Sequence, residues 1–469
     1  MIKLNKYIQA PILLLAIILL TSCGKNRSNE IVEAQHIQRW IYSTMEENYF
    51  WNDDIPEETK LDFFAEPSSF FNKLLSPKDG KRIEGGQSYA YSYIVNTDKK
   101  PGTKSLRQPE YSYGFDFRGI ITNIEEKNQI LAQLFYTLPN SPASKAGLKR
   151  GDLIKAIDQK PLTEGSLANL IGGEAINIEF YRPLPDGSLN LLKVKLEDAV
   201  EVENNPIFMY KKISNKTGYL VYNHFTASKN ENDNEYNNQL KALSNYFNGV
   251  EDFILDLRYN NGGLVSTAEL LHAILAPTNQ LKNSPGYLLY RNDKKVAMDT
   301  PEKRLGSDGT NLDLKRLFII TSSTTASASE LIINSLKPFI EVHVIGETTE
   351  GKNVGSLGYT RENWEMHPIV CKVYNSIDQS DYSGGFEPGI HTARQSNAIK
   401  EYQIQERLNI GELGEESDPL LQKVLQYMAI LPKPKTDTRT TIKETKFKVL
   451  GSSIDKRRTN NLIVNPLEN

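Results

Sequence analysis

The chain has 469 residues, which is more than one hydrophobic core usually holds, so we expect two or three domains. Its 39% hydrophobic and 24% charged content is typical of a soluble globular protein. The formal net charge of -3 gives no broad electrostatic attraction for nucleic acid, and we expect no nucleic-acid partner.

The first 23 residues have the pattern of an export signal. Lys3 and Lys6 precede the apolar run Ile12–Leu20, which is long enough for a signal sequence and too short to span a bilayer. The run ends in Leu-Thr-Ser-Cys-Gly, which resembles the lipobox of bacterial lipoproteins and predicts lipidation of Cys23. An ordinary signal-peptidase cleavage site nearby is the alternative.

Acyl chains on Cys23 would anchor the protein to a membrane. The following Gly24–Arg27 lacks an acidic cluster, which favours an outer-membrane protein that faces the periplasm over one exposed on the cell surface.

Residues 24–110 are predicted to form a short polar tether and a small helical cap. Between residues 31 and 75, apolar positions recur at helical spacing, and several of them are aromatic, including Phe63, Phe64, Phe70 and Phe71. Core packing explains them, and contact with a substrate channel is the alternative.

Residues 111–200 are predicted to form a separate β-rich domain. It opens on Tyr113-Gly114-Phe115, and residues 141–154 read SPASKAGLKRGDLI. Together these segments resemble a PDZ domain, which would take the terminal carboxylate of a peptide at the loop Tyr113, Gly114 and Phe115. A spacer with the same fold and no ligand is the alternative.

Residues 206–432 are predicted to form an α/β core. Four apolar strands alternate with helical stretches, which indicates a largely buried sheet; they cover Gly218–Tyr222, Phe253–Leu257, Leu317–Thr321 and Val342–Gly346. Residues 433–469 lose apolar density and gain lysine and arginine, so we expect a loosely held basic tail.

Three segments of this core carry chemistry together, although each alone has an ordinary explanation. Asp256–Gly263 ends a strand with adjacent glycines, and this pattern alone is typical of a tight turn. Ser327 precedes a helix, where serine is usually a cap, and Ser327-x-x-Glu330 fits a capping box. Lys352 follows another strand in a glycine-flanked loop, where a solvated lysine is common.

Taken in order, these segments resemble the C-terminal processing peptidases, or tail-specific proteases. The matching motifs are DLR with Gly262-Gly263, then ASASE at 326–330, then GETT at 346–349 with Gly351-Lys352. The resemblance covers roughly residues 110–432 and implies a ClpP/crotonase-like catalytic core, and the aromatic cap at 40–51 is similar to that of Bacteroidetes lipoprotein members.

The resemblance implies a serine endopeptidase with Ser327 as nucleophile and Lys352 as general base, 25 residues further on. Lys352 must be neutral for this role, so its pKa must fall from about 10.4 toward neutrality by burial. The backbone N–H groups of Ala328 and Gly263 would form the oxyanion hole. Ser356 stands where many relatives have a glutamine that orients the lysine, so Ser356 is a possible shorter substitute.

No metal or cofactor is expected, and the expected partners are polypeptides with accessible, apolar C-termini. Ser329 is the rival nucleophile, and His224 is the best rival base among six histidines. Cys371 has no disulfide partner once Cys23 is lipidated, and we expect it to be a packed thiol. Two other functions stay open: an inactive scaffold that binds polypeptides, motivated by Ser356, and a crotonase-type acyl transferase, which export disfavours.

Overall fold

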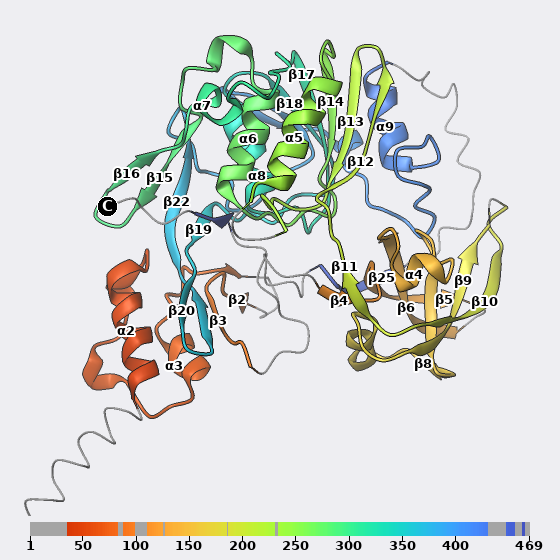
Figure 1. The fold of residues 1–469 in the computed structure, drawn as a ribbon, viewed down its shortest axis with the longest axis horizontal. Coiled ribbons are helices and arrows are strands. Elements are labelled where there is room, and N and C mark those ends of the chain that lie inside the picture. The colour runs from red at the N-terminus through yellow and green to blue at the C-terminus, as the bar shows by residue number, and fades with distance from the viewer. Residues whose placement is uncertain are drawn as a thin grey trace, which may run out of the picture. The chain divides into compact units, whose positions relative to one another are not determined.

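The structure is a computed structural model that describes residues 35–82, 88–98, 110–124, 127–184, 186–229, 233–429, 447–454 and 462–464. The predicted signal sequence and Cys23 lie outside these residues. The chain forms two compact units, one of residues up to 99 with 357–370, the other of residues 100–356 with 371–469. The mixed α/β fold with several sheets confirms the predicted fold class at that level (Figure 1).

The first unit is a helical cap with short strands. Its elements are α2 (His36–Asn48), η1 (Asn52–Asp54), η2 (Glu58–Lys60), α3 (Pro67–Lys73), β1 (Lys81–Arg82), β2 (Ser88–Tyr89) and β3 (Tyr93–Asn96). One face of α2 buries Ile41 and Met45, as the helical spacing predicts. One expectation was wrong: Phe63 and Phe64 lie outside any helix, and Phe64 is exposed.

A hairpin from much later in the chain completes this unit. Strands β20 (Tyr359–Arg361) and β21 (Trp364–His367) form a three-stranded sheet with β3, in the order β20-β21-β3. The predicted peptidase core of 206–432 is therefore interrupted, because residues 357–370 pack with the cap.

The second unit is built around a seven-stranded central sheet in the order β12-β13-β14-β17-β18-β23-β24. The bounds are β12 (Ile207–Ser214), β13 (Thr217–Tyr222), β14 (Asp252–Asp256), β17 (Arg316–Thr321), β18 (Glu341–Gly346), β23 (Gly389–His391) and β24 (Ser396–Ala398). The four predicted core strands are confirmed as β13, β14, β17 and β18, which are parallel neighbours.

Helices cover both faces of the central sheet (Figure 1). One face carries α5 (Glu235–Tyr246), α6 (Val265–Leu275) and α8 (Ala328–Leu336), and the opposite face carries α9 (Pro419–Tyr427). The shorter elements of this part are η4 (Thr278–Gln280), α7 (Pro301–Leu305) and η5 (Lys400–Tyr402).

The parallel strands bring the three sequence segments to one edge of the sheet. Strand β14 runs into the glycine turn 262–263, β17 runs into the turn before α8, and β18 runs into the loop that carries Lys352. Because the carboxyl ends of neighbouring parallel strands meet at one edge, the topology gathers these segments where α/β proteins commonly bind ligands.

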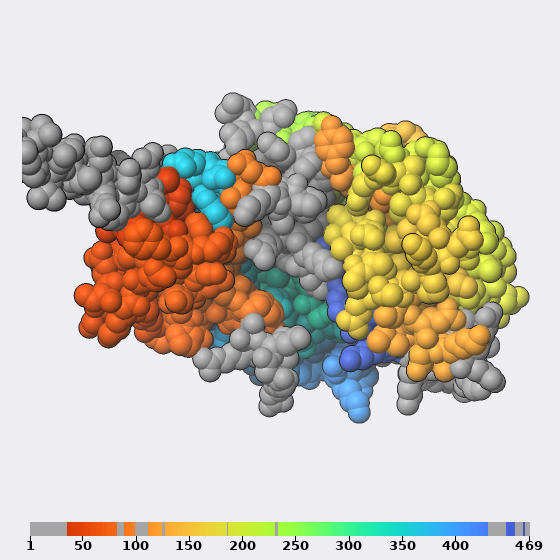
Figure 2. Space-filling model, turned by 90° about the horizontal axis from the view of Figure 1, so that it is seen from below, coloured from red at the N-terminus to blue at the C-terminus, as the bar shows by residue number. Residues whose placement is uncertain are grey.

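Residues 110–202 form most of a small sheet in the order β10-β9-β7-β6-β5-β25. The strands of this sheet from this region are β5 (Phe115–Ile124), β6 (Lys127–Thr137), β7 (Leu153–Ile157), β8 (Lys160–Pro161), β9 (Ile176–Pro183) and β10 (Leu189–Leu196). The same region holds α4 (Pro142–Lys145) and η3 (Gly165–Leu170), and β4 (Glu110–Ser112) pairs with β11 (Val200–Val202) in a separate two-stranded sheet. These residues, orange to yellow, make one continuous body on the right of the space-filling view (Figure 2).

Another sheet of this unit, the outer sheet, has the order β16-β15-β22-β19-β26. Its strands are β15 (Gly286–Tyr290), β16 (Lys295–Ala297), β19 (Val354–Ser356), β22 (Ile369–Asn375) and β26 (Leu462–Ile463).

The expectation of a loosely held tail was wrong for its described parts. Strand β25 (Phe447–Ser452) pairs with β5 of the small sheet, and β26 pairs with β19 of the outer sheet. Ile454 and Val464 are 1% and 2% exposed, so each apolar side chain is packed despite the basic residues around it.

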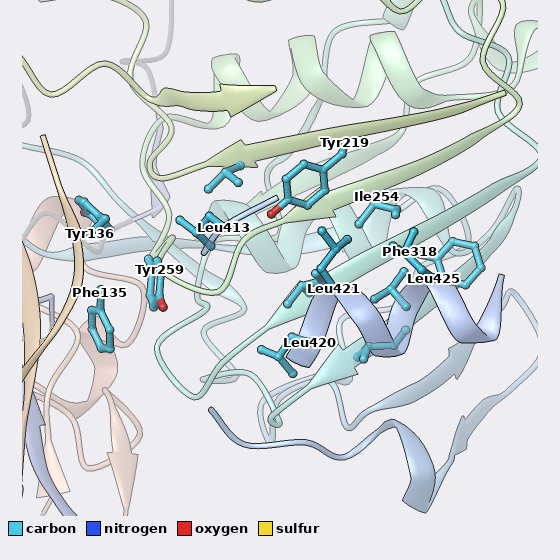
Figure 3. Close-up of a cluster of buried hydrophobic side chains, with 14 of the residues drawn as sticks. Phe135, Tyr136, Tyr219, Ile254, Tyr259, Phe318, Leu413, Leu420, Leu421 and Leu425 are labelled. Atoms are coloured by element: carbon cyan, nitrogen blue, oxygen red, sulfur yellow. The ribbon is translucent and has the colours of Figure 1, made fainter. Parts of the chain in front are cut away.

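One hydrophobic cluster joins the small sheet to the central sheet. Phe135 and Tyr136 of β6 belong to the same cluster as Tyr219, Ile254 and the leucines of α9, as Figure 3 shows. The small sheet therefore contributes side chains to the core of the central sheet, and the predicted boundary between 111–200 and 206–432 stays a prediction.

A buried ionic cluster lies beside this core. The Arg258 guanidinium, with no exposed side-chain surface, binds the Asp256 carboxylate at 2.6 Å and that of Glu406 at 2.9 Å. Arg150 of the small sheet reaches the same Glu406 at 2.7 Å. Burial alone would raise the pKa of Glu406, but the three arginines around it, Arg150, Arg258 and Arg118, lower it to about 2.

We expect Arg258→Ala to destabilise the fold by about 3–5 kcal/mol, because it leaves buried carboxylates without their cation. Urea unfolding measures this change. The matched control is Arg316→Ala, whose partner Asp252 forms a pair near the surface, and it should cost less than about 1 kcal/mol. Equal effects of the two substitutions would contradict this account of the cluster.

Candidate active site

Ser327 lies in a strained turn between strand β17 and helix α8. Its φ is +64° and its ψ is −114°, and its side chain is fully buried. Non-glycine residues seldom adopt positive φ, and such strain costs about 1–3 kcal/mol unless the surroundings impose it. Residues held this way cluster at active sites, so the backbone itself marks Ser327 as more than a helix cap.

The hydroxyl of Ser327 is not used as a cap. Ser327 and Glu330 have the arrangement of a capping box, but only the glutamate half of it makes a hydrogen bond, from the Ser327 N–H to the Glu330 carboxylate at 2.8 Å. The Ser327 Oγ is buried and has no hydrogen-bond partner among the described residues. The rival Ser329 instead donates its hydroxyl to the Asn260 carbonyl at 3.1 Å, which leaves it less available.

The glycine turn packs directly against this serine. A Cβ at Gly262, where φ is +109°, would lie 2.6 Å from the Ser327 Cβ, so only glycine fits. Asn260 ties the two segments together, because its carbonyl accepts the Ala326 N–H at 3.3 Å and its side-chain oxygen accepts the Gly262 N–H at 2.8 Å.

The two predicted oxyanion donors flank this contact. Gly263 follows Gly262 in the turn, and Ala328 begins α8. Within the described residues, their N–H groups donate to no backbone carbonyl outside their own helix or strand. The amide nitrogen of Ala328 would lie 3.0 Å from a Cβ built at Gly262, so the start of α8 packs against the glycine turn.

The carboxylate of Glu330 joins the serine turn to the lysine loop. One oxygen accepts the backbone N–H groups of Ser327 and Lys352, both at 2.8 Å. The other accepts the Gly351 N–H at 2.6 Å and the Thr349 hydroxyl at 2.5 Å. Burial raises the pKa of Glu330 to about 7, although each of these four hydrogen bonds favours the ionised form.

Sequence reasoning missed this role of Glu330. Its only signal was the capping-box spacing, which correctly predicts the bond to the Ser327 N–H but says nothing of the lysine loop 21 and 22 residues further on.

Lys352 lies in a buried loop and not on the surface. It is 3% exposed, and the preceding Gly351 adopts φ +95° where a Cβ would lie 2.3 Å from the Ser383 carbonyl oxygen. Ser356 follows in β19, where it is fully buried and its Oγ makes no hydrogen bond among the described residues. Its role in orienting Lys352 therefore stays a prediction.

The rival base and the free thiol are engaged elsewhere. His224 has both ring nitrogens occupied, one by the Thr226 hydroxyl and one by the Asn204 carbonyl, each at 2.9 Å. The Ser327 Oγ has no histidine partner. Cys371 is fully buried, and burial raises the pKa of its thiol to about 12, as expected for a packed thiol.

The predicted peptide-binding loop lies at the start of β5. Tyr113 and Phe115 are buried, and the Gly114 N–H donates to the Ser112 hydroxyl at 2.9 Å. A Cβ at Gly114, where φ is +83°, would lie 2.1 Å from the Ser141 Cβ, which explains the glycine. Binding of a terminal carboxylate by these residues stays a prediction.

The described residues hold neither a membrane-spanning helix nor a cluster of metal-binding side chains. No helix among them is both long and apolar enough to span a bilayer. No group of three or more histidine, cysteine, aspartate or glutamate side chains in this part of the chain is placed to hold a metal ion.

Comparisons with known proteins show the family of this chain. A model of the peptidase S41 N-terminal domain matches residues 36–93, and a model of peptidase family S41 matches residues 216–392, which together cover half of the chain. The chain belongs to peptidase family S41. Ser327, Lys352, Ala328 and Gly263 all lie within the second match.

Individual relatives extend the match. A carboxyl-terminal-processing protease of Picosynechococcus is 24% identical over 346 residues, 71% of this chain and 75% of the relative. A probable CtpA-like serine protease of Staphylococcus aureus is 26% identical over 319 residues, 63% of this chain and 58% of the relative. The solved structure of a putative S41 protease from Bacteroides fragilis is 28% identical, with a TM-score of 0.70, and covers 84% of this chain and 98% of that one.

The chain is therefore a serine-type peptidase of family S41, homologous to C-terminal processing proteases, and it acts on polypeptides.

We expect Gly262→Ala to lower kcat about 100-fold or more, because the new methyl group displaces Ser327 and forces a strained φ. Peptide hydrolysis measures the loss. The control is Gly384→Ala, where a Cβ would meet no atom within 4 Å, and it should keep its activity. Full activity in Gly262→Ala would show that the contact with Ser327 is not needed.

Glu330 predicts a distinct pH dependence. As the pH falls through about 7, a proton on Glu330 removes acceptor capacity for the Ser327 and Lys352 loops, so kcat/KM should fall. In Glu330→Gln only one side-chain oxygen remains to accept hydrogen bonds. We therefore expect kcat/KM to be about 10–100-fold lower and this component of the acid limb to be lost. The control is Glu341→Gln, at an exposed site on β18, which should keep the native pH profile.

The same carboxyl should affect stability in the opposite sense. Folding raises the pKa of Glu330 from 4.5 to about 7, so its contribution to the free energy of unfolding is full below 4.5 and is lost as the pH rises through 7. Urea unfolding of Glu330→Gln between pH 4.5 and 7 should show a flatter dependence than the native protein. An unchanged dependence in both measurements would contradict the assignment.

Proposed function

We propose that the protein is a serine endopeptidase in which Ser327 is the nucleophile and Lys352 the general base. The observation that carries this proposal is the convergence of three segments at one sheet edge. Gly262 packs on Ser327, and a single oxygen of Glu330 binds the backbone of both Ser327 and Lys352. Among the described residues the Ser327 Oγ has no hydrogen-bond partner, and the positive φ of Ser327 is of the strained kind that clusters at active sites.

The reaction divides into acylation and hydrolysis. The Ser327 Oγ attacks the scissile carbonyl carbon while the neutral amine of Lys352 takes the hydroxyl proton. The N–H groups of Ala328 and Gly263 donate to the oxyanion as it forms. The C–N bond then breaks, and the lysine ammonium gives its proton to the leaving amine.

Hydrolysis reverses the roles. Water attacks the acyl-enzyme as Lys352 takes a proton from it, the Ser327 Oγ leaves and recovers a proton, and the carboxylic product departs. Lys352 is 3% exposed, and this burial beside the serine turn supports its role in the reaction over that of a surface lysine.

The proposal includes a ClpP/crotonase-like fold for the central sheet and a PDZ-like fold for the small sheet. Parallel strands with helices on both faces support a ClpP/crotonase-like core. The small sheet supports a PDZ-like domain, since β5 begins directly after the Gly114 turn and the short helix η3 borders the same strand through Leu167. Such a domain would present polypeptides with apolar C-termini to the active site.

We also infer a location in the bacterial envelope. The lipobox-like sequence ending at Cys23 supports a lipid anchor, with the peptidase held at the outer membrane and facing the periplasm. A scaffold without activity is the alternative, and the lack of a hydrogen bond from the Ser356 Oγ is the observation in its favour.

Substitution of the dyad tests the proposal. Ser327→Ala and Lys352→Ala should each lower the hydrolysis of an unfolded polypeptide by about 10⁴-fold or more. The matched controls, Ser329→Ala and His224→Ala, should retain cleavage in the same assay. Cleavage that persists in both dyad variants would overturn the assignment, and binding without cleavage by the native protein would favour the scaffold.

A further inference from the structure

Two short strands near the end of the chain pair with edge strands to which an extended substrate could also bind. Strand β25 adds to the edge of the small sheet beside β5, and β26 adds to the edge of the outer sheet beside β19. Both pairings depend on backbone hydrogen bonds, which any extended polypeptide can make.

Strand β25 occupies the edge that follows the predicted peptide-binding loop. It runs antiparallel to β5, from Phe447 opposite Thr122 to Ser452 opposite Arg118, and so it advances toward the Gly114 turn. The Ser453 N–H continues this pairing with a bond of 2.8 Å to the Phe117 carbonyl. This is the direction in which a ligand strand would approach a carboxylate-binding loop at the start of β5.

A side chain of β25 also fills the space between β5 and the short helix η3. Leu450 packs against the same hydrophobic cluster as Leu167 of η3. A Cβ at Gly119 of β5 would lie 2.6 Å from Leu167 and 3.6 Å from Leu450, so these two leucines face one another across that glycine. The strand thus contributes an apolar side chain as well as backbone bonds.

Strand β26 lies between the two elements that carry the candidate catalytic groups. The Ile463 N–H donates to the Gly263 carbonyl at 3.0 Å, and the Val464 N–H donates to the Ser356 carbonyl at 3.0 Å. Ile463 also bridges Leu264, while Leu462 and Ile463 pair with Gly355 and Ser356. Successive N–H groups point to opposite sides of a strand, so β26 is bonded on both sides.

This strip adjoins Gly263, whose N–H is a proposed oxyanion donor, so a substrate chain that reaches this donor would lie along it. The scissile carbonyl must reach the Gly263 N–H, and the neighbouring Gly263 carbonyl accepts an N–H from the occupant of the strip. Val464 is 2% exposed, so its apolar side chain is buried against the protein, as an apolar side chain of a substrate would be.

We propose that residues 447–454 and 462–464 are an internal ligand of the peptidase, and that an extended polypeptide substrate binds by displacing β26 from the strip between Gly263 and Ser356. This inference rests on the proposed function, because it takes the strip between Gly263 and Ser356 to be the place where the substrate backbone binds. Because the two occupants exclude each other, the affinity for substrate is reduced by the fraction of molecules in which β26 is in place.

The first test needs no catalysis. In the Ser327→Ala protein, saturating unfolded β-casein should increase hydrogen exchange in the peptic fragment that contains Ile463 and Val464, as the casein chain takes over their acceptors. Unchanged exchange in that fragment while casein is bound would overturn the proposal.

The second test measures activity. Ile463→Pro removes the N–H that bonds Gly263, so kcat/KM for casein should rise about tenfold, whereas Ile463→Val keeps the N–H and should match the native protein. A synthetic peptide of residues 460–469 should inhibit the proline variant again. Equal kcat/KM in all three proteins would overturn the internal ligand, whereas loss of Ser327-dependent cleavage in all of them would overturn the proposed function instead.

Discussion

The carboxylate of Glu330 is the contact on which the geometry of the active site depends. It is buried without an adjacent cation in its hydrogen-bond set, and four donors from the serine turn and the lysine loop hold it. Burying a carboxylate is costly, and it is tolerated where its oxygens are fully bonded. The same four bonds fix the distance between two loops that the sheet places near each other but does not join. Neither loop can move without leaving part of this carboxylate unsatisfied.

Much of the core was predictable because its pattern is local. Four apolar runs became the parallel strands β13, β14, β17 and β18, and their carboxyl ends meet at one edge whatever the details of packing. The gathering of Gly262, Ser327 and the Lys352 loop follows from that topology. The strained φ of Ser327 does not, because Gly262 and Asn260 impose it through contacts between distant segments.

Several parts that sequence reasoning missed depend on long-range pairing. The hairpin 359–367 joins β3, some 270 residues earlier, and short strands of this kind have no period that distinguishes them from loops. The end of the chain misled for a second reason. Its lysines and arginines predict a solvated tail, yet Ile454 and Val464 are buried. Val449 is exposed although it lies on a paired strand, so apolar and charged residues of the same segment face different surroundings.

Distant parts of the second unit are joined by a buried ionic cluster and by short strand pairings, and these two kinds of contact differ in how easily they open. Arg258 and Glu406 are buried charges, so separating them inside the protein would leave each charge buried without its partner. Strand β26 is held by a few backbone bonds and one buried valine, and such short pairings open locally without global unfolding. A substrate chain that offers the same N–H donors replaces each bond it breaks. The small sheet and the core can therefore stay joined while the strip beside Ser327 exchanges one strand for another.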